Sequence, residues 1–187
     1  MKNLIVGWLL FCSLCLPATS GAGQGSASNN PISTLLRGNL TRGQNNIVKS
    51  AELVPESLYG MRPGPQMEVR TFGQLIGHLA NFSYIFCSDA KGEKNPSQDK
   101  DFEKLTSKTE LVKALNAAFS YCSGVYAEVT DASLTETISA TRDDGTKVPA
   151  LRIARLITDI SHNQEHYGNI VTYMRIKSMV PPTSMQP

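Results

Sequence analysis

Residues 71–90 of the chain read TFGQLIGHLANFSYIFCSDA, and this stretch has the pattern of an amphipathic helix. Thr71 and Gln74 have the spacing of a capping box, in which a hydroxyl accepts from a first-turn amide and the Gln side chain reaches back. Large apolar residues then follow at helical spacing: Phe72, Leu75, Leu79, Phe82 and Phe86. The stretch therefore predicts a helix that begins at Thr71 and ends near Ala90.

Three further segments have a helical pattern. One covers about residues 34–53, and another begins at a second capping-box sequence, Ser107 to Glu110, and runs to about Val129. The last has Pro149 in its first turn, where a missing amide costs nothing, and ends before Pro181. No segment predicts a hairpin or an alternating strand of useful length. Four long amphipathic helices without a sheet predict an all-α four-helix bundle.

The connections between these helices are long. The loop at residues 91–106 has about 16 residues, more than antiparallel neighbours need, so it is a candidate crossover between parallel helices. At ~1.5 Å per residue, Cys87 and Cys122 would then both lie ~23 Å along their helices, at one level. Two interpretations stay open: a disulfide between them, or two buried thiols that pack as small apolar groups.

The N-terminus has the pattern of a targeting signal. Lys2 precedes an apolar run at residues 4–16, which is short for a spanning helix of ~20 residues, and Pro17 and small residues follow. We expect a signal peptide at residues 1–22, a flexible leader at 23–31, the bundle at 32–182 and a tail at 183–187. The protein would be exported to the periplasm or the extracellular space, without stable membrane insertion after cleavage. The alternative is an uncleaved N-terminal anchor.

The charges argue against a nucleic-acid partner. The chain has 18 Lys and Arg against 16 Asp and Glu, and no block of like charge occurs. The run Lys100–Lys104 mixes both signs, and it predicts solvated surface rather than a functional site.

The chain has three histidines, and all fall on predicted helices. His162 and His166 are four residues apart, so they share one helical face with Cβ atoms ~6 Å apart. His78 lies on the helix at 71–90 among apolar and small residues. If all three meet, they form a three-nitrogen site with an open position, as in catalytic zinc sites. The plainer alternative is three packed or surface histidines.

Two segments carry a resemblance to a known family. Residues 70–80, RTFGQLIGHLA, resemble the second helix of the DinB family, and residues 159–168, DISHNQEHYG, resemble the HxxxH motif of its last helix. The resemblance covers roughly residues 32–182. It implies an up-down-down-up four-helix bundle and one divalent ion, usually zinc or nickel. It assigns the ion to His78, His162 and His166, and it also implies a homodimer.

Neighbouring polar residues are candidates for supporting roles. Asp159 could orient the second nitrogen of His162, or be a solvated carboxylate. Glu165 is the candidate catalytic base on metal-bound water, the alternative being an exposed helix charge. Asn81, one turn after His78, is expected to line the pocket.

Two classes of function follow. In the first, the ion is a Lewis acid, and the protein is a metal-dependent hydrolase or an S-transferase acting on an unidentified small molecule. The resemblance implies transferases that use low-molecular-weight thiols, but export away from the reduced cytosolic thiol pool favours hydrolysis. In the second class the ion only cross-links helices, and the bundle is a non-enzymatic binding or stress-response module.

Overall fold

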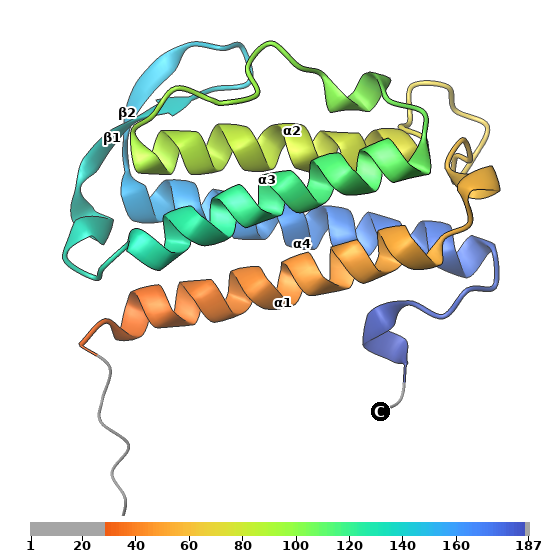
Figure 1. The fold of residues 1–187 in the computed structure, drawn as a ribbon, viewed down its shortest axis with the longest axis horizontal. Coiled ribbons are helices and arrows are strands. Elements are labelled where there is room, and N and C mark those ends of the chain that lie inside the picture. The colour runs from red at the N-terminus through yellow and green to blue at the C-terminus, as the bar shows by residue number, and fades with distance from the viewer. Residues whose placement is uncertain (1–28, 186–187) are drawn as a thin grey trace, which may run out of the picture.

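Four long helices form the body of the protein in the computed structural model, which describes residues 29–185. They are α1 (Pro31–Leu53), α2 (Phe72–Lys91), α3 (Lys108–Glu128) and α4 (Arg152–Ile176) (Figure 1). The expectation of a four-helix bundle is therefore confirmed. The signal peptide expected at residues 1–22 lies outside the described residues. None of the helices that are described has an apolar stretch long enough to cross a membrane.

The helices α1 and α4 run in one direction, and α2 and α3 run in the opposite one (Figure 1). Side chains at the helix ends mark this arrangement. At the start of α3, Lys108 Nζ donates to the carbonyl of Glu52 near the end of α1, at 2.7 Å. At the start of α4, Arg152 Nε donates to the carbonyl of Ala90 near the end of α2, at 2.8 Å. The long 92–107 connection thus carries the chain back to begin α3 beside the start of α2.

Cys87 and Cys122 form a disulfide between the parallel helices α2 and α3, with their Cα atoms 5.3 Å apart. Of the two interpretations that the sequence leaves open, the structure contains the bridge. Both residues are fully buried. The parallel direction of the two helices is what puts residues equally far from each N-terminus at one level.

The predicted helix starts and stops at α2 are confirmed. Thr71 accepts from the Gln74 amide at 3.2 Å, and the Gln74 side chain accepts from the Thr71 amide at 2.9 Å, so the capping box is complete. At the other end Gly92 has φ 79°, a left-handed conformation that glycine adopts without strain, and its amide caps the last turn. Ser107 caps α3 through the Glu110 amide at 3.5 Å.

The segment before α4 is a β-hairpin, whereas the sequence predicted no strand there. Residues Thr137–Thr141 (β1) and Lys147–Leu151 (β2) form an antiparallel hairpin, so the fold is not purely helical. Pro149 lies in β2, where it pairs with Ser139 of β1, and it is not in the first turn of α4. Because Arg152 donates to the Glu136 carbonyl, the alternation of an antiparallel ladder makes the Pro149 position non-hydrogen-bonded. The missing amide costs nothing there.

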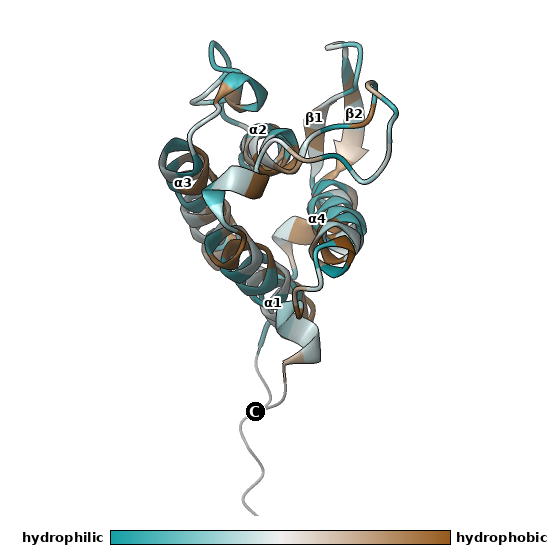
Figure 2. Ribbon diagram, turned by 90° about the vertical axis from the view of Figure 1, so that its right-hand side faces the viewer, coloured by the Kyte–Doolittle hydropathy of each residue, from teal (hydrophilic) through white to brown (hydrophobic). Residues whose placement is uncertain are grey.

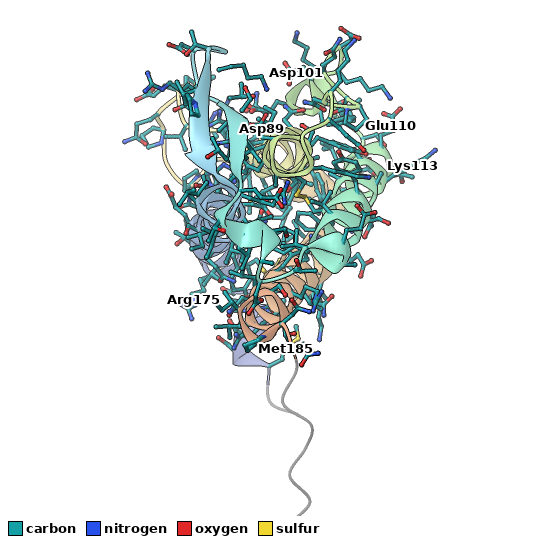
Figure 3. All side chains as sticks on the ribbon, turned by 90° about the vertical axis from the view of Figure 1, so that its left-hand side faces the viewer. Asp89, Asp101, Glu110, Lys113, Arg175 and Met185 are labelled. Atoms are coloured by element: carbon teal, nitrogen blue, oxygen red, sulfur yellow. A yellow bond between two sulfur atoms is a disulfide. The ribbon has the colours of Figure 1, made fainter. Side chains whose placement is uncertain are left out.

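Asp89, near the end of α2, ties this hairpin to the bundle (Figure 3). Its buried carboxylate accepts from the Thr141 amide at 2.7 Å, from Lys147 Nζ at 2.8 Å and from Arg155 Nη2 at 2.6 Å. Because the carboxylate is paired with two cations and an amide, its burial does not leave a bare charge. The hairpin, α2 and α4 are thereby fixed to one another.

The core lies between the four helices, where their apolar residues meet (Figure 2). It has two main clusters. One is centred on Phe72, Ile76, Leu79, Leu115 and Met174, toward the start of α2. The other surrounds the disulfide and Tyr126, toward the hairpin. The histidines of α2 and α4 lie on the facing sides of these two helices, so the packing of α2 against α4 determines their separation.

Candidate metal centre

The three histidines meet between α2 and α4. The Nε2 atom of His162 lies 3.1 Å from Nε2 of His78 and 3.1 Å from Nε2 of His166. One ligand nitrogen from each ring falls within a group whose members are all within 4.8 Å of one another. The sequence could place His162 and His166 together from their spacing, and tertiary packing brings in His78.

The donor set and its spacing fit a divalent ion. A histidine nitrogen lies about 2.0–2.1 Å from bound zinc, so two tetrahedral ligands are about 3.3 Å apart. The separations of 3.1 Å between Nε2 atoms are close to this value. Neutral imidazole also suits nickel, copper and iron, so the three rings do not select one metal.

The outer nitrogen of His78 has a partner that determines its tautomer. Nδ1 of His78 lies 2.7 Å from a carboxylate oxygen of Glu103. A carboxylate only accepts, so Nδ1 carries the proton and Nε2 presents a lone pair to the centre of the group. Nδ1 of His166 contacts the Asn169 side-chain amide at 3.2 Å. Nδ1 of His162 is buried and has no hydrogen-bond partner among residues 29–185.

The surroundings keep the three imidazoles neutral. The pKa of His162 is lowered to about 3 and that of His166 to about 4, mainly by burial and to a smaller extent by neighbouring histidines and Arg70. Burial also lowers the pKa of His78, against the opposing effect of its hydrogen bond to Glu103. A neutral ring is the form that ligates a metal, so no positive charge on the rings opposes metal binding at neutral pH.

Glu103 is a site residue that the sequence analysis missed. The run Lys100–Lys104 was expected to be solvated surface, but Phe102–Lys104 forms a short 3-10 helix, η2, against α2. The Glu103 side chain is only 24% exposed, and it bridges His78 Nδ1 and Arg70 Nε, the latter at 2.8 Å. A carboxylate on the outer nitrogen of a ligating histidine orients the ring and raises its basicity.

Two residues of α2 let η2 come this close. A Cβ on Gly77 would lie 2.3 Å from the Phe102 carbonyl oxygen, so only glycine leaves room for the backbone of η2. One turn later the Asn81 side chain donates to Asp101 at 3.0 Å and accepts from the Phe102 amide at 3.0 Å. Asn81 therefore holds the loop that carries Glu103. Gly77 and Asn81, one turn apart on a buried helix, were the sequence features that could have indicated a loop packed against α2.

Aromatic rings surround His162. Its imidazole stacks on Phe82, with centroids 5.1 Å apart and planes 28° apart, and meets Phe86 edge-on at 5.2 Å. Phe82 also contacts His78, with centroids 4.4 Å apart. The predicted apolar stripe of α2 thus continues into the site. These rings restrict the imidazoles and exclude water from one side.

Asp159 does not orient His162. The carboxylate is fully buried and accepts from the Tyr126 hydroxyl at 3.0 Å and from Asn163 Nδ2 at 3.2 Å. One of its oxygens also lies 3.8 Å from Cys87 Sγ. Burial raises the pKa of Asp159 to about 7, against the opposing effect of the two hydrogen bonds. It belongs to the core beside the disulfide and leaves His162 Nδ1 unpartnered.

Glu165 lies on the exposed side of α4, one residue before His166. Its charge raises the pKa of His78 and of His166 as a minor effect, so it is near the site but forms no hydrogen bond to either ring. Its role as a base stays a prediction.

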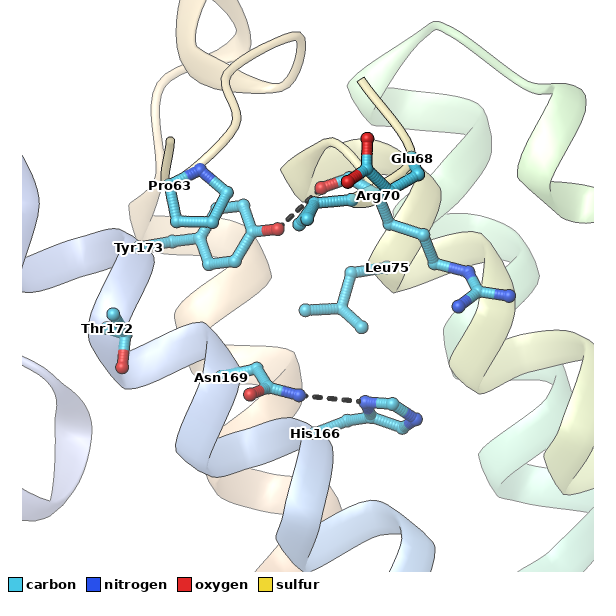
Figure 4. Close-up of a pocket in the computed structure, with 9 residues that line it drawn as sticks. Pro63, Glu68, Arg70, Leu75, His166, Asn169, Thr172 and Tyr173 are labelled. Atoms are coloured by element: carbon cyan, nitrogen blue, oxygen red, sulfur yellow. Dashed lines mark hydrogen bonds between the residues drawn. The ribbon is translucent and has the colours of Figure 1, made fainter. Parts of the chain in front are cut away.

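A cavity of about 270 Å³, which we call the His166 pocket, adjoins the histidines (Figure 4). It lies between the 63–70 segment and α4. The residues that define it here are Glu68, Arg70, Leu75, His166, Asn169 and Tyr173. Asn169 lines this pocket, whereas the expected lining residue Asn81 does not. The pocket gives a small molecule access to the His166 side of the site.

The fold and site define a four-helix bundle with a candidate three-histidine metal centre open on one side. The DinB superfamily model matches residues 39–170, and the chain belongs to this superfamily. The comparison with curated proteins gives no match.

Solved structures of similar fold include DinB-like proteins from two bacilli. The Bacillus cereus protein is 19% identical with a TM-score of 0.65, and the match covers 79% of this chain and 93% of that one. The Bacillus subtilis protein is 19% identical with a TM-score of 0.62, covering 82% and 99%. A mycothiol-dependent maleylpyruvate isomerase is 14% identical with a TM-score of 0.56, covering 74% of this chain and 60% of that one.

Proposed function

We propose that the protein is a metal-dependent enzyme in which His78, His162 and His166 hold one divalent ion. The observation that carries this proposal is the convergence of three Nε2 atoms, those of His78 and His166 each lying 3.1 Å from that of His162, beside an accessible pocket. Without an ion, one Nε2–H proton can form a linear hydrogen bond across only one of the two 3.1 Å contacts, which leaves the other unsatisfied. A divalent ion, zinc or nickel foremost, resolves this conflict.

The ion would supply Lewis acidity, which lowers the pKa of a bound water or thiol and polarises a substrate oxygen. The residues around it have separate tasks. Glu103 holds His78 in its ligating tautomer, and Phe82 shields His162 from water. Glu165, one residue from His166, is the candidate for proton transfer from the nucleophile.

Water is the nucleophile that we favour, which makes the protein a hydrolase. Support comes from the disulfide, because such bridges persist in oxidising compartments, away from reduced low-molecular-weight thiols. The same bridge supports export through the N-terminal signal. A thiol is the second candidate, because a mycothiol-dependent isomerase shares the fold.

The competing proposal is a non-enzymatic bundle whose ion only cross-links α2 and α4. The His166 pocket argues against it, because a structural zinc site is closed whereas a catalytic site keeps an open position. The homodimer implied by the family resemblance stays a prediction.

Elemental analysis of the purified protein tests the metal centre. We expect about one equivalent of ion per chain in the wild type and in Ser161→Ala, an exposed neighbour on α4, and almost none in His162→Ala. Wild-type protein without bound zinc, nickel or another transition metal after reconstitution would refute the proposal.

Turnover then separates the classes. The metal-loaded protein is assayed on ester and amide substrates, with and without added thiols. Activity that disappears with the metal while helicity and melting temperature persist supports catalysis, and thiol dependence would favour the transferase. A large loss of melting temperature on metal removal, with no turnover in either assay, would favour the structural role.

A further inference from the structure

Arg70 lines the His166 pocket at the end of the connector before α2, and its guanidinium lies on the α2 side of the pocket, away from Pro63 and Tyr173 (Figure 4). Its Nε atom donates to Glu103 at 2.8 Å. Its two Nη atoms have no hydrogen-bond partner among residues 29–185. The Tyr173 hydroxyl donates to the Arg70 backbone carbonyl, which fixes the base of the side chain to α4. The guanidinium is therefore fixed through Nε, and its two Nη atoms are available to donate to a ligand.

The guanidinium is near the metal centre as well as the pocket. The Glu103 carboxylate links the two, because it lies 2.8 Å from Arg70 Nε and 2.7 Å from Nδ1 of His78. Arg70 and His166 both line the same cavity. One ligand in this cavity could therefore contact the guanidinium and His166 together.

The balance of charge favours an anion in this pocket. Three neutral imidazoles would leave the two charges of a divalent ion uncompensated, whereas the charge of Arg70 is balanced by its ion pair with Glu103. Glu103 is engaged by both His78 and Arg70. The pocket's other acid, Glu68, lies at the end opposite His166 in Figure 4. With an ion bound, the region between Arg70 and His166 would thus be positive, whereas the Glu68 end would not.

We propose that Arg70 binds the carboxylate of a small organic acid that occupies the His166 pocket, so the substrate is an anionic metabolite. The proposal rests on the proposed function and names its substrate class. The planar pair of Nη donors matches the two oxygens of a carboxylate. The volume of about 270 Å³ is at the low end for ligand sites, which suits a small acid rather than a peptide. Leu75 provides the apolar wall beside the guanidinium (Figure 4).

The test measures binding rather than turnover. Succinate and its uncharged analogue succinamide are titrated by calorimetry into protein saturated with zinc, with the zinc content of every sample measured. We expect the wild type to bind succinate and not succinamide. Arg70→Gln should weaken succinate binding at least tenfold, and Arg70→Lys should weaken it less because the charge remains without the planar fork.

Two controls isolate the guanidinium. Arg175→Gln removes an exposed positive charge from the last turn of α4 outside the pocket, and should leave succinate affinity unchanged (Figure 3). Lys177→Gln removes the exposed charge at the C-cap of the same helix, and should also leave succinate affinity unchanged.

Several results would overturn the proposal. They are wild-type affinity in Arg70→Gln at equal zinc content, equal weakening in Arg175→Gln, and tighter binding of inorganic phosphate than of succinate. Failure of the wild type to bind zinc would instead contradict the proposed function, so the two failures are distinguishable.

Discussion

The Phe102 carbonyl oxygen occupies space that a side chain on Gly77 would need, 2.3 Å from the position of a Cβ. This close approach of η2 to α2 puts Glu103 on the outer nitrogen of His78. A glycine in the middle of a helix normally costs about 1 kcal/mol relative to alanine. At Gly77 this cost is offset because η2 can pack against α2.

Gly77→Ala should therefore destabilise the protein, although alanine is the better helix former. We expect a loss of about 1–3 kcal/mol in the free energy of unfolding, as for other overpacked sites, together with weaker zinc binding. Urea unfolding and zinc titration measure the two effects. Gly124→Ala on α3 is the matched control, because a Cβ there has nothing within 4 Å, and it should stabilise the protein by about 0.5–1 kcal/mol. A stabilised Gly77→Ala would contradict the docking argument.

Glu103→Gln should reduce metal affinity about 10- to 100-fold, because the carboxylate no longer orients His78 and raises its basicity. Competition with a zinc chelator measures this change. Glu165→Gln is the comparison variant: it should retain zinc, and if Glu165 is the base, turnover should fall about 10²- to 10⁴-fold. Equal metal affinity in Glu103→Gln and the wild type would show that the contact with His78 does not support the site.

Reduction of the Cys87–Cys122 disulfide should destabilise the fold. The two cysteines are 35 residues apart, and closing a loop of this length corresponds to about 4 kcal/mol in the chain-entropy treatment. Urea unfolding with and without a reductant measures the difference. In Cys87→Ala the reductant should have no effect. An unreduced mass showing two free thiols in the mature protein would contradict the bridge.

The buried Asp159 should make stability fall as pH rises. Its folded-state pKa is raised from 3.8 to about 7, so between these values the folded protein keeps a proton that the unfolded chain has lost. Unfolding then becomes more favourable with increasing pH, by about 2–3 kcal/mol between pH 5 and pH 8 for this group. Unfolding of metal-depleted wild type and Asp159→Asn at both pH values isolates the effect. The variant should lack this part of the slope, and identical slopes would show that Asp159 is ionised in the folded state throughout.

Local sequence patterns predicted the long helices well, since helix starts, stops and apolar faces depend on residues three or four positions apart. The capping box at Thr71 and Gln74 is an example, and the i, i+4 pair His162 and His166 is another. The hairpin was missed because Pro149 was interpreted as a helix-start residue. A proline suits a non-hydrogen-bonded strand position equally well, and only the pairing with Ser139 distinguishes the two.

The sequence by itself determined the helices and the chemical type of the site: three imidazoles, two of them on one helical face. Tertiary structure decided which residues support that site. Glu103 reaches His78 from 25 residues away because η2 docks at Gly77 and Asn81, whereas Asp159, only three residues from His162, faces the core. Side-chain direction across elements depends on packing, which no local pattern encodes. For the same reason, only the folded chain brings Arg70 and His166 to one pocket.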